Sequence, residues 1–557
     1  MPFSVFSILV ADPERTFYAT FPSVTTSKVS KESEGHLITP TTSEKLFRVA
    51  ALGGLAAVLS LIASPEATAG RKRGLHPATP PPPRAVRYPG DADLSEALRK
   101  VVENKPFSSA RTSIQVLDAE SGQSVFSHDP DMVLKPASNM KVVTSATAVA
   151  LLGPEFRFKT AFYASRPPDA SGVVHGDIFI KGGGSPGLVG EEWWLIARRM
   201  RALGITKIEG DVVGDDTYFD DVRRGPRWPS PVVDNPYNAP VSALSCFYSS
   251  VSITVTPTSP GSPPDVFLDP FSSYFRVVNR AITSSQGLDL RVGRQWDGQQ
   301  NIIHVEGRIP TGSGPITTYR SVEEPTLYAL SAFKDAVARE GIAITGTLRA
   351  GVVPRGSHFL HVHESKPLAD LIQDMNKESN NFMAESILKT IGAETGGAPG
   401  SSQKGAAAVK RYLETLGVST EGLVQVDGSG LSPDNRVSSN ILARILLATR
   451  NDFQAAPEFM ASLPIGGIDG TLDHRMMGGP ATRKIRAKTG FINGVSSLSG
   501  YAWNENGRLL VFSILVNDAG GGLGDVIRSV DRFCSTLVRS SLPPGSPIVP
   551  TPAAEGG

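Results

Sequence analysis

The chain has 557 residues, which is too long for one ordinary hydrophobic core and predicts several domains. Hydrophobic residues make up 40% and charged residues 20%, a balance typical of globular proteins. Lys plus Arg number 55 against 54 Asp plus Glu, and this net charge of +1 argues against nucleic acid as a partner. The two cysteines, Cys246 and Cys534, fit no zinc-binding spacing and no disulfide framework.

The N-terminal region contains an apolar run of signal-peptide length at residues 49–63. Lys45 and Arg48 precede the run, and Ala67-Thr68-Ala69 follows it as an A-x-A cleavage site. We therefore interpret residues 1–69 as an upstream extension plus a signal peptide cleaved after Ala69, which predicts an exported, periplasmic protein. Because 44 residues precede Lys45, we hypothesise that translation truly starts near residue 45. An uncleaved anchor is the alternative interpretation of the run.

The elements that follow alternate between helical and strand patterns. Residues 70–90 read as a Pro-rich linker, 94–103 as a helix and 112–128 as a hairpin turning at Gly122. Short alternating runs then predict a β-rich insertion, in which residues 191–204 and 326–341 are the helical exceptions. Helical spacing returns at 367–394, a hairpin follows at 496–518 around Asn506-Gly507, and a helix follows at 523–540. Residues 541–557 are expected to be a disordered tail.

Ser138 and Lys141 form an S-x-x-K pair at the start of a helix-like run. On a helix, positions i and i+3 share a face, so Lys141 can reach the Ser138 hydroxyl. A lysine whose pKa is lowered, for example by a second cation nearby, can take the hydroxyl proton and create a nucleophile. The alternative is a serine that only caps the helix, and the pair alone does not decide between them.

Two further short motifs decide in favour of the nucleophile. Ser379-Asn380-Asn381 precedes a helical run, and Lys488-Thr489-Gly490 enters a strand. With S-x-x-K they match, in the right order, the S-x-x-K, S-D-N and K-T-G set of penicillin-binding proteins and class A β-lactamases. Each motif is weak alone, but the three together strongly indicate a serine acyltransfer site.

Longer stretches narrow the resemblance to one family. The segments "PASNMK", "MNKESNNFMAE", "DGSGLS", "GIDGTL" and "AKTG" closely resemble low-molecular-mass class C penicillin-binding proteins, the D-alanyl-D-alanine carboxypeptidase/endopeptidases. The resemblance covers residues 91–540. It implies an α/β (α+β) fold, in which a transpeptidase-like domain with an antiparallel sheet flanked by helices is interrupted by a large β-rich insertion. The domain would comprise 91–160 and 353–540, and the insertion 161–352.

The resemblance also implies a role for each motif residue. Ser138 is the acylated nucleophile and Lys141 its general base, while Ser379 relays a proton and Asn381 holds Lys141 and the substrate amide. Lys488 supplies positive charge, Thr489 binds the terminal carboxylate, and the N–H groups of Ser138 and of Phe491, which follows Gly490, form the oxyanion hole. No metal or cofactor is implied. The partners are peptidoglycan stem peptides as substrate and β-lactams as acylating inhibitors.

The chain departs from the family pattern at a few positions. Asn380 replaces the commoner Asp of S-D-N, and its side chain is not expected to do chemistry. Phe491 replaces a Ser or Thr whose hydroxyl could bind the carboxylate, which bears on carboxypeptidase rate and substrate preference. The family often has Asp-Pro-Thr where this chain has Ser185-Pro186-Gly187 in "KGGGSPGL", so Ser185 and Gly187 depart from its pattern.

For several other patterns we favour a structural interpretation over a functional one. "KGGGSPGL" lacks the consecutive Gly-Lys-Ser/Thr of a phosphate loop, and "GDDTYFDD" lacks EF-hand spacing. His361 and His363 in "HFLHVHE" share a strand face, and we interpret them as part of an exposed edge strand instead of a metal site. "DGSGL" has its glycines misplaced for a nucleophile elbow and is expected to support the rim of the site.

The predicted function is therefore a serine D-alanyl-D-alanine carboxypeptidase, with DD-endopeptidase activity possible on cross-linked peptides. A serine β-lactamase is one alternative, although no Glu-x-x-Leu-Asn stretch lies between Asn381 and Lys488 to position a deacylating water. A non-catalytic wall-binding scaffold is the other, and the complete set of motifs argues against it.

Overall fold

The computed structural model describes residues 89–230, 233–519 and 522–540. The predicted signal peptide, residues 70–88 of the linker and the predicted tail lie outside the described residues. We call residues 89–158 and 365–540 the main domain and residues 159–364 the insertion.

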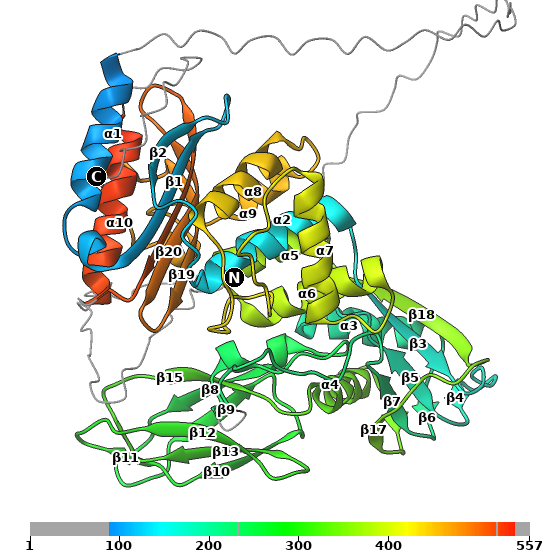
Figure 1. Cartoon of the computed structure of the whole chain (residues 1–557). Coiled ribbons are helices and arrows are strands. Elements are labelled where there is room, and N and C mark those ends of the chain that lie inside the picture. Colours follow the sequence, from blue (N-terminus) through cyan, green and yellow to red (C-terminus); the bar gives the residue numbers. More distant parts are fainter. Residues whose placement is uncertain (1–88, 231–232, 520–521, 541–557) are drawn as a thin grey trace, which may run out of the picture. The chain divides into compact units, whose positions relative to one another are not determined.

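The main domain is built on an antiparallel sheet whose strands come from both ends of the chain (Figure 1). Its order in the described part of the chain is β19-β20-β21-β1-β2, which makes β19 an edge strand. The two predicted hairpins form as β1-β2 and β20-β21, and β1 pairs with β21 to join them. The strands are β1 (Arg111–Asp118), β2 (Ser124–His128), β19 (Ile485–Ile492), β20 (Val495–Trp503) and β21 (Leu509–Asn517).

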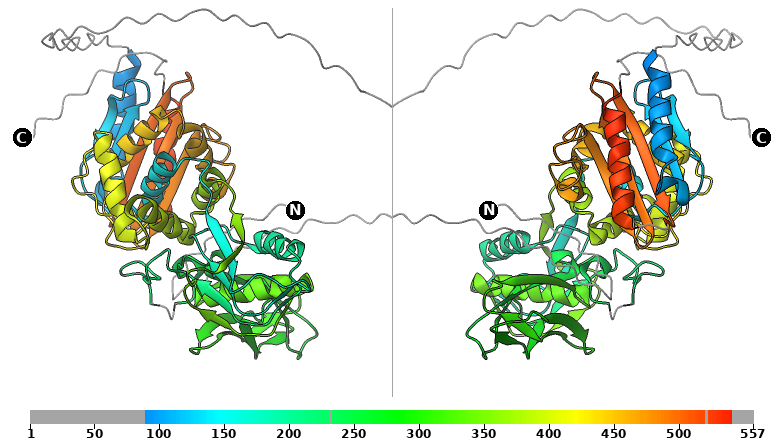
Figure 2. Two further views of the ribbon diagram at one scale, coloured as in Figure 1. Left: turned by 90° about the vertical axis from the view of Figure 1, so that its right-hand side faces the viewer. Right: turned by 90° about the vertical axis from the view of Figure 1, so that its left-hand side faces the viewer.

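Helices cover both faces of this sheet (Figures 1 and 2). Alternate residues of a strand point to opposite faces, and β21 shows the consequence. Phe512 and Ile514 pack with α1 and α10, whereas Val511 and Leu515 pack with α2 and α8. The central strand is therefore buried on both sides. The helices are α1 (Pro89–Val102), α2 (Met140–Leu152), α5 (Leu368–Glu378), α6 (Asn381–Gly396), α7 (Ser402–Thr415), α8 (Ser439–Asn451), α9 (Ala456–Ser462) and α10 (Leu523–Val538).

The insertion consists mainly of short strands, with α3 (Gly190–Ala202) and α4 (Pro325–Arg339) at the two predicted helical positions. Its largest sheet has the order β17-β7-β5-β3-β18, and smaller sheets have the orders β15-β8-β9, β10-β13-β12, β16-β6-β4 and β11-β14. The strands are β3 (Lys159–Ala164), β4 (Val173–Val174), β5 (Ile178–Lys181), β6 (Lys207–Ile208), β7 (Val212–Asp215), β8 (Ser250–Thr256), β9 (Asp265–Asp269), β10 (Phe275–Asn279), β11 (Ile282–Ser284), β12 (Arg291–Trp296), β13 (Asn301–Glu306), β14 (Arg308–Pro310), β15 (Ile316–Ser321), β16 (Ala343–Ile344), β17 (Leu348–Ala350) and β18 (His358–Glu364).

The chain leaves the main domain through β3 and returns through β18, and these two strands pair with each other. Lys159 lies opposite Glu364 at the junction, and the N–H of Phe158 donates to Ser365 Oγ over 3.0 Å. Both ends of the insertion therefore meet at one place, so it can be accommodated without separating the two parts of the main domain. Its largest sheet extends over residues 159–364, a wider span than the 161–352 expected from the sequence.

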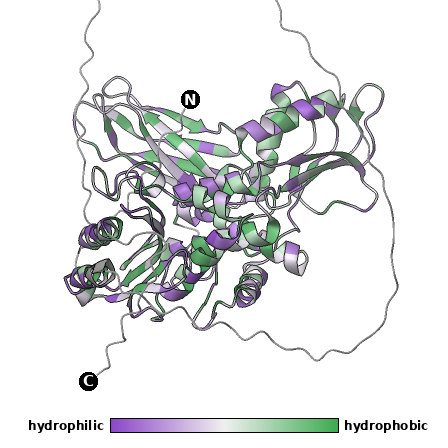
Figure 3. Cartoon of the chain, turned by 90° about the horizontal axis from the view of Figure 1, so that it is seen from above, coloured by the Kyte–Doolittle hydropathy of each residue, from purple (hydrophilic) through white to green (hydrophobic). Residues whose placement is uncertain are grey.

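Burial follows the sequence pattern in most elements. The helices at the periphery carry both hydrophobic and hydrophilic residues, as helices with one buried face must (Figure 3). Cys246 and Cys534 are both buried and unpaired.

Candidate active site

Ser138 lies on a short 3-10 helix, η2 (Ala137–Asn139), which leads directly into α2. Lys141 is in the first turn of α2, and its Nζ is 3.0 Å from Ser138 Oγ. The residue at the N-cap of α2 is Asn139, and it makes no side-chain capping bond. The alternative interpretation of Ser138 as a helix cap is therefore wrong, and its hydroxyl contacts the lysine as the S-x-x-K motif predicts.

The turn that carries Ser138 is held against the edge strand β19. Asn139 Nδ2 donates to the carbonyl of Lys488 over 3.1 Å and to Ser497 Oγ over 2.8 Å, and Ser497 in turn donates to the carbonyl of Pro136 over 2.6 Å. Gly490 permits this close approach, because a Cβ there would lie 2.1 Å from Ser497 Oγ. The glycine of K-T-G thus has a steric reason that its sequence pattern does not reveal.

The S-N-N motif forms the sharp turn between α5 and α6. Ser379 adopts the left-handed conformation with φ of 56°, and Asn381 is the first residue of α6. Asn380 caps α6, since its side chain accepts the N–H of Met383 over 3.0 Å. Asn and Asp are similarly good N-caps, which gives the departure at Asn380 a physical explanation.

Lys141 links the first two motifs. The side chain is fully buried, and its ammonium donates to Asn381 Oδ1 over 2.6 Å and to the carbonyl of Ser429 over 2.9 Å, in addition to Ser138. Asn381 also donates through Nδ2 to the carbonyl of Tyr237 over 3.0 Å, and Tyr237 belongs to the insertion. The insertion therefore reaches the site itself.

Lys488 links the third motif to the second. Its ammonium, also fully buried, donates to Ser379 Oγ over 2.8 Å and to the carbonyl of Thr489 over 2.9 Å. Since Ser379 and Asn381 belong to one turn, the two lysines approach that turn from different elements, α2 and β19. Three segments that are distant in sequence thus meet at one place.

Burial lowers the pKa of Lys141 to about 7, against the opposing effect of Asp427 and Glu385. The pKa of Lys488 is lowered well below its usual value, first by burial and then by the charge of Lys141. The sequence suggested that a second cation lowers the pKa of Lys141, and the structure identifies desolvation as the cause. Lys141 can therefore be a neutral amine near neutral pH and accept the proton of Ser138.

The remaining predicted site residues lie on β19. Thr489 Oγ1 donates to Thr471 Oγ1 over 2.7 Å, which places the "GIDGTL" segment beside K-T-G. Phe491 is half-buried and pairs with Ser496 on β20, and its side chain offers no hydroxyl for a carboxylate. Thr489 and Phe491 thus share β19 with Lys488, and the side-chain hydroxyl of Thr489 donates to Thr471 and not to Ser138.

Sequence reasoning missed several residues of the site. Asn139 occupies an unspecified position of S-x-x-K, and Ser497 lies outside every motif. Ser429 and Tyr237 act through backbone carbonyls, so their side-chain types give no signal. "DGSGL" was expected to support the rim, and the contact between the Ser429 carbonyl and Lys141 is consistent with such support.

The "HFLHVHE" and "GDDTYFDD" patterns make other contacts. His363 Nε2 lies 2.6 Å from Glu192 Oε2, and β18 is an edge strand as expected. In "GDDTYFDD", Asp220 forms an ion pair with Lys389. Among the described residues there is no group of three or more side chains arranged to hold a metal ion.

Comparison of the sequence with models of known protein families identifies the family to which these motifs belong. The model for the D-Ala-D-Ala carboxypeptidase 3 (S13) family matches residues 94–535. The chain belongs to this family. It is similar to the D-alanyl-D-alanine carboxypeptidase of Actinomadura sp. (strain R39), with 34% identity over 449 residues, which covers 77% of this chain and 82% of the relative.

The solved structures agree on the fold. Penicillin binding protein 4 from Haemophilus influenzae superposes with a TM-score of 0.68 at 24% identity, covering 79% of this chain and 98% of the other. Its complex with a β-lactam gives a TM-score of 0.63 at 22% identity, covering 80% and 98%. The predicted fold and the predicted serine D-alanyl-D-alanine carboxypeptidase activity are therefore confirmed. No helix in the described ranges is long and apolar enough to cross a membrane.

Proposed function

We propose that this carboxypeptidase cleaves peptidoglycan stem peptides through an acyl-enzyme on Ser138. The contact of 3.0 Å between Ser138 Oγ and the buried Lys141 Nζ carries the proposal. With its pKa near 7, Lys141 takes the hydroxyl proton while Oγ attacks the carbonyl carbon of the penultimate D-alanine. The C–N bond then breaks, the terminal D-alanine leaves with a proton, and water hydrolyses the ester.

The other motif residues take roles that fit their positions. Ser379, which contacts Lys488, relays the proton to the leaving amine, while Asn381 orients Lys141 and binds the substrate amide. The N–H groups of Ser138 and Phe491 form the oxyanion hole, and losing one such donor typically costs about 3 kcal/mol. Lys488 supplies the positive charge for the terminal carboxylate, because a bound carboxylate favours the charged form of the lysine against the burial that lowers its pKa. Thr489 and Gly490 line the carboxylate-binding site.

Acylation is expected to depend on pH through Lys141. Only the neutral amine can accept the Ser138 proton, so the acylation rate constant should rise as pH increases and level off above the pKa of about 7. Stopped-flow measurement of β-lactam acylation between pH 5 and 9 checks this. A rate constant that is flat across pH 7, or that falls as pH rises through it, contradicts a lysine base.

Digestion of purified muropeptides tests the reaction and its substrate. Pentapeptides should lose one D-alanine, and the mass of the products identifies that loss. Conversion of cross-linked dimers to monomers would add endopeptidase activity at the same site. Pentapeptides that remain intact with enzyme still able to bind penicillin would contradict the proposed substrate.

β-Lactams are proposed as acylating inhibitors, because they mimic an acyl-D-alanyl-D-alanine group and the Haemophilus influenzae neighbour is known in complex with one. A β-lactamase would differ by rapid turnover of the acyl-enzyme. We also propose that the protein is exported to the cell envelope, in the periplasm, with cleavage after Ala69. N-terminal sequencing of the mature protein tests that site.

A further inference from the structure

Glu385 on α6 is a buried carboxyl group that the proposed chemistry does not use. The side chain is only 3% exposed, and its two oxygens accept the N–H of Gly428 over 2.9 and 3.0 Å. Oε1 also accepts the N–H of Ser429 over 2.9 Å. The carbonyl of the same Ser429 accepts from Lys141 Nζ over 2.9 Å. One residue thus separates the Glu385 carboxyl from the proposed base.

A second buried carboxyl holds the other half of this loop. Asp427 accepts the N–H groups of Gly430 and Ser432, each over 2.7 Å, and Asn435 Nδ2 over 2.8 Å. It also accepts Trp228 Nε1 from the insertion over 2.8 Å. The two carboxyl groups therefore divide the loop 427–432 between them, and Glu385 holds the part that faces Lys141.

We infer that Glu385 is a positioning residue for Lys141: its carboxyl fixes the Gly428–Ser429 backbone so that the Ser429 carbonyl orients the lysine toward Ser138. The inference rests on the proposed function, in which Lys141 is the base. Glu385 itself touches neither Ser138 nor, in the proposed reaction, the substrate.

Titratable groups on several elements surround Lys141 and Glu385. Glu385 and Asp427 both raise the pKa of Lys141, while burial lowers it, and Lys488 is the neighbouring cation. Around Glu385, burial and Asp427 raise the pKa of the carboxyl, and the N–H donors of Gly428 and Ser429 oppose that rise. Lys389, one turn along α6, is engaged by Asp220 and the carbonyl of Val222. Because the pKa of Glu385 is raised to about 8, its carboxyl is largely uncharged near pH 7, and Lys141 depends on Glu385 for its position more than for its charge balance.

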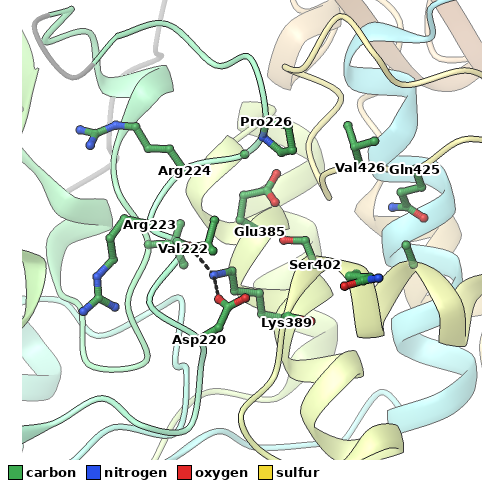
Figure 4. A pocket seen from close by; sticks show the side chains of 15 residues that line it. Asp220, Val222, Arg223, Arg224, Pro226, Glu385, Lys389, Ser402, Gln425 and Val426 are labelled. Carbon is green, nitrogen blue, oxygen red and sulfur yellow. Dashed lines mark hydrogen bonds and ion pairs between the residues drawn. The ribbon is translucent and has the colours of Figure 1, made fainter.

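A cavity of about 430 Å³ reaches Glu385 from the surface (Figure 4). Val222 and Pro226 from the insertion and Val426 from the main domain form part of its wall. In a variant that lacks the carboxyl, formate is small enough to enter this cavity and accept the two backbone N–H groups. The structure thus offers a way to restore the missing carboxylate from solution.

Glu385→Gln tests the inference through the rate and pH dependence of penicillin acylation. The amide keeps the shape but offers one acceptor oxygen, so the acylation rate constant is expected to fall roughly 10- to 100-fold. The rising limb near pH 7 should stay close to its wild-type position, because burial and then Asp427 raise the pKa of Glu385 to about 8, so that near pH 7 the carboxyl carries little charge for Gln to remove. Glu394→Gln on the same helix is the matched control, since Glu394 is exposed and accepts from Tyr218. It should change neither value.

Glu385→Ala and Glu385→Asp complete the test. Formate should restore acylation by the Ala variant in a concentration-dependent way, whereas chloride at the same concentration should not. The Asp variant keeps a carboxylate and should retain the position of the pH limb even if its rate falls. A wild-type acylation rate constant in the Gln variant, or no rescue by formate, overturns the inference. Wild-type enzyme that shows no penicillin label overturns the proposed function itself, so the two failures are distinguishable.

Discussion

Replacing Ser138 with alanine is expected to lower kcat for D-alanine release by about 10⁶-fold, because the variant has no nucleophile to form the acyl-enzyme. Covalent labelling by a fluorescent penicillin should disappear completely. The fold should survive, since η2 is held by Asn139 and Ser497 and not by the Ser138 hydroxyl. Gel fluorescence and muropeptide digestion measure the two losses.

Ser535→Ala is a suitable control for this variant. Ser535 is half-buried like Ser138, but its hydroxyl donates to the carbonyl of Asp531 within α10, on the opposite face of the sheet. The control should label and digest like wild type. A label that persists in Ser138→Ala would mean that another nucleophile reacts, and the assignment of the acylated residue would be wrong.

The parts of the fold that could be predicted are those specified locally. The hairpin around Asn506-Gly507 and the amphipathic pattern of α10 are short-range signals, and both elements form where expected. β18 illustrates the limit. Its pairing with β3 joins residues about two hundred positions apart, and no local pattern assigns the strand to the insertion instead of the main domain.

The same distinction applies to the site. Five residues could be named because they belong to short side-chain motifs: Ser138, Lys141, Ser379, Asn381 and Lys488. In the structure, hydrogen bonds link Lys141 to Ser138 and Asn381, and Lys488 to Ser379 in the same turn as Asn381. Glu385, Ser429 and Tyr237 could not be named in the same way. Ser429 and Tyr237 contribute backbone carbonyls, and Glu385 acts on backbone N–H groups. Such contacts depend on how segments pack, which the order of side chains does not specify.

The lowered pKa of Lys141 also depends on packing. The sequence suggested only that a second cation nearby could lower it, yet full burial is the dominant cause, and the nearby Asp427 and Glu385 oppose it. A lysine in the first turn of a helix is ordinarily exposed, so the desolvation becomes evident only once α6 and the loop 427–432 are in place around α2.

Replacing Lys141 with methionine is expected to slow acylation of Ser138 by about 10⁴-fold, since Met fills a similar volume but cannot accept a proton. Lys141→Arg should be similarly impaired, because a guanidinium stays protonated at every accessible pH. Neither variant should show the rising limb near pH 7. Stopped-flow acylation with a chromogenic β-lactam measures these rates.

Lys389→Met separates loss of the base from loss of a buried charge. Lys389 is as buried as Lys141 to within a few per cent, and it pairs with Asp220, away from Ser138. Its replacement should lower the melting temperature, because Asp220 loses its partner, yet leave the acylation rate of the folded protein within about threefold of wild type. If Lys141→Met acylates as fast as Lys389→Met, the proton of Ser138 must go to another group, and Lys141 would only orient Asn381.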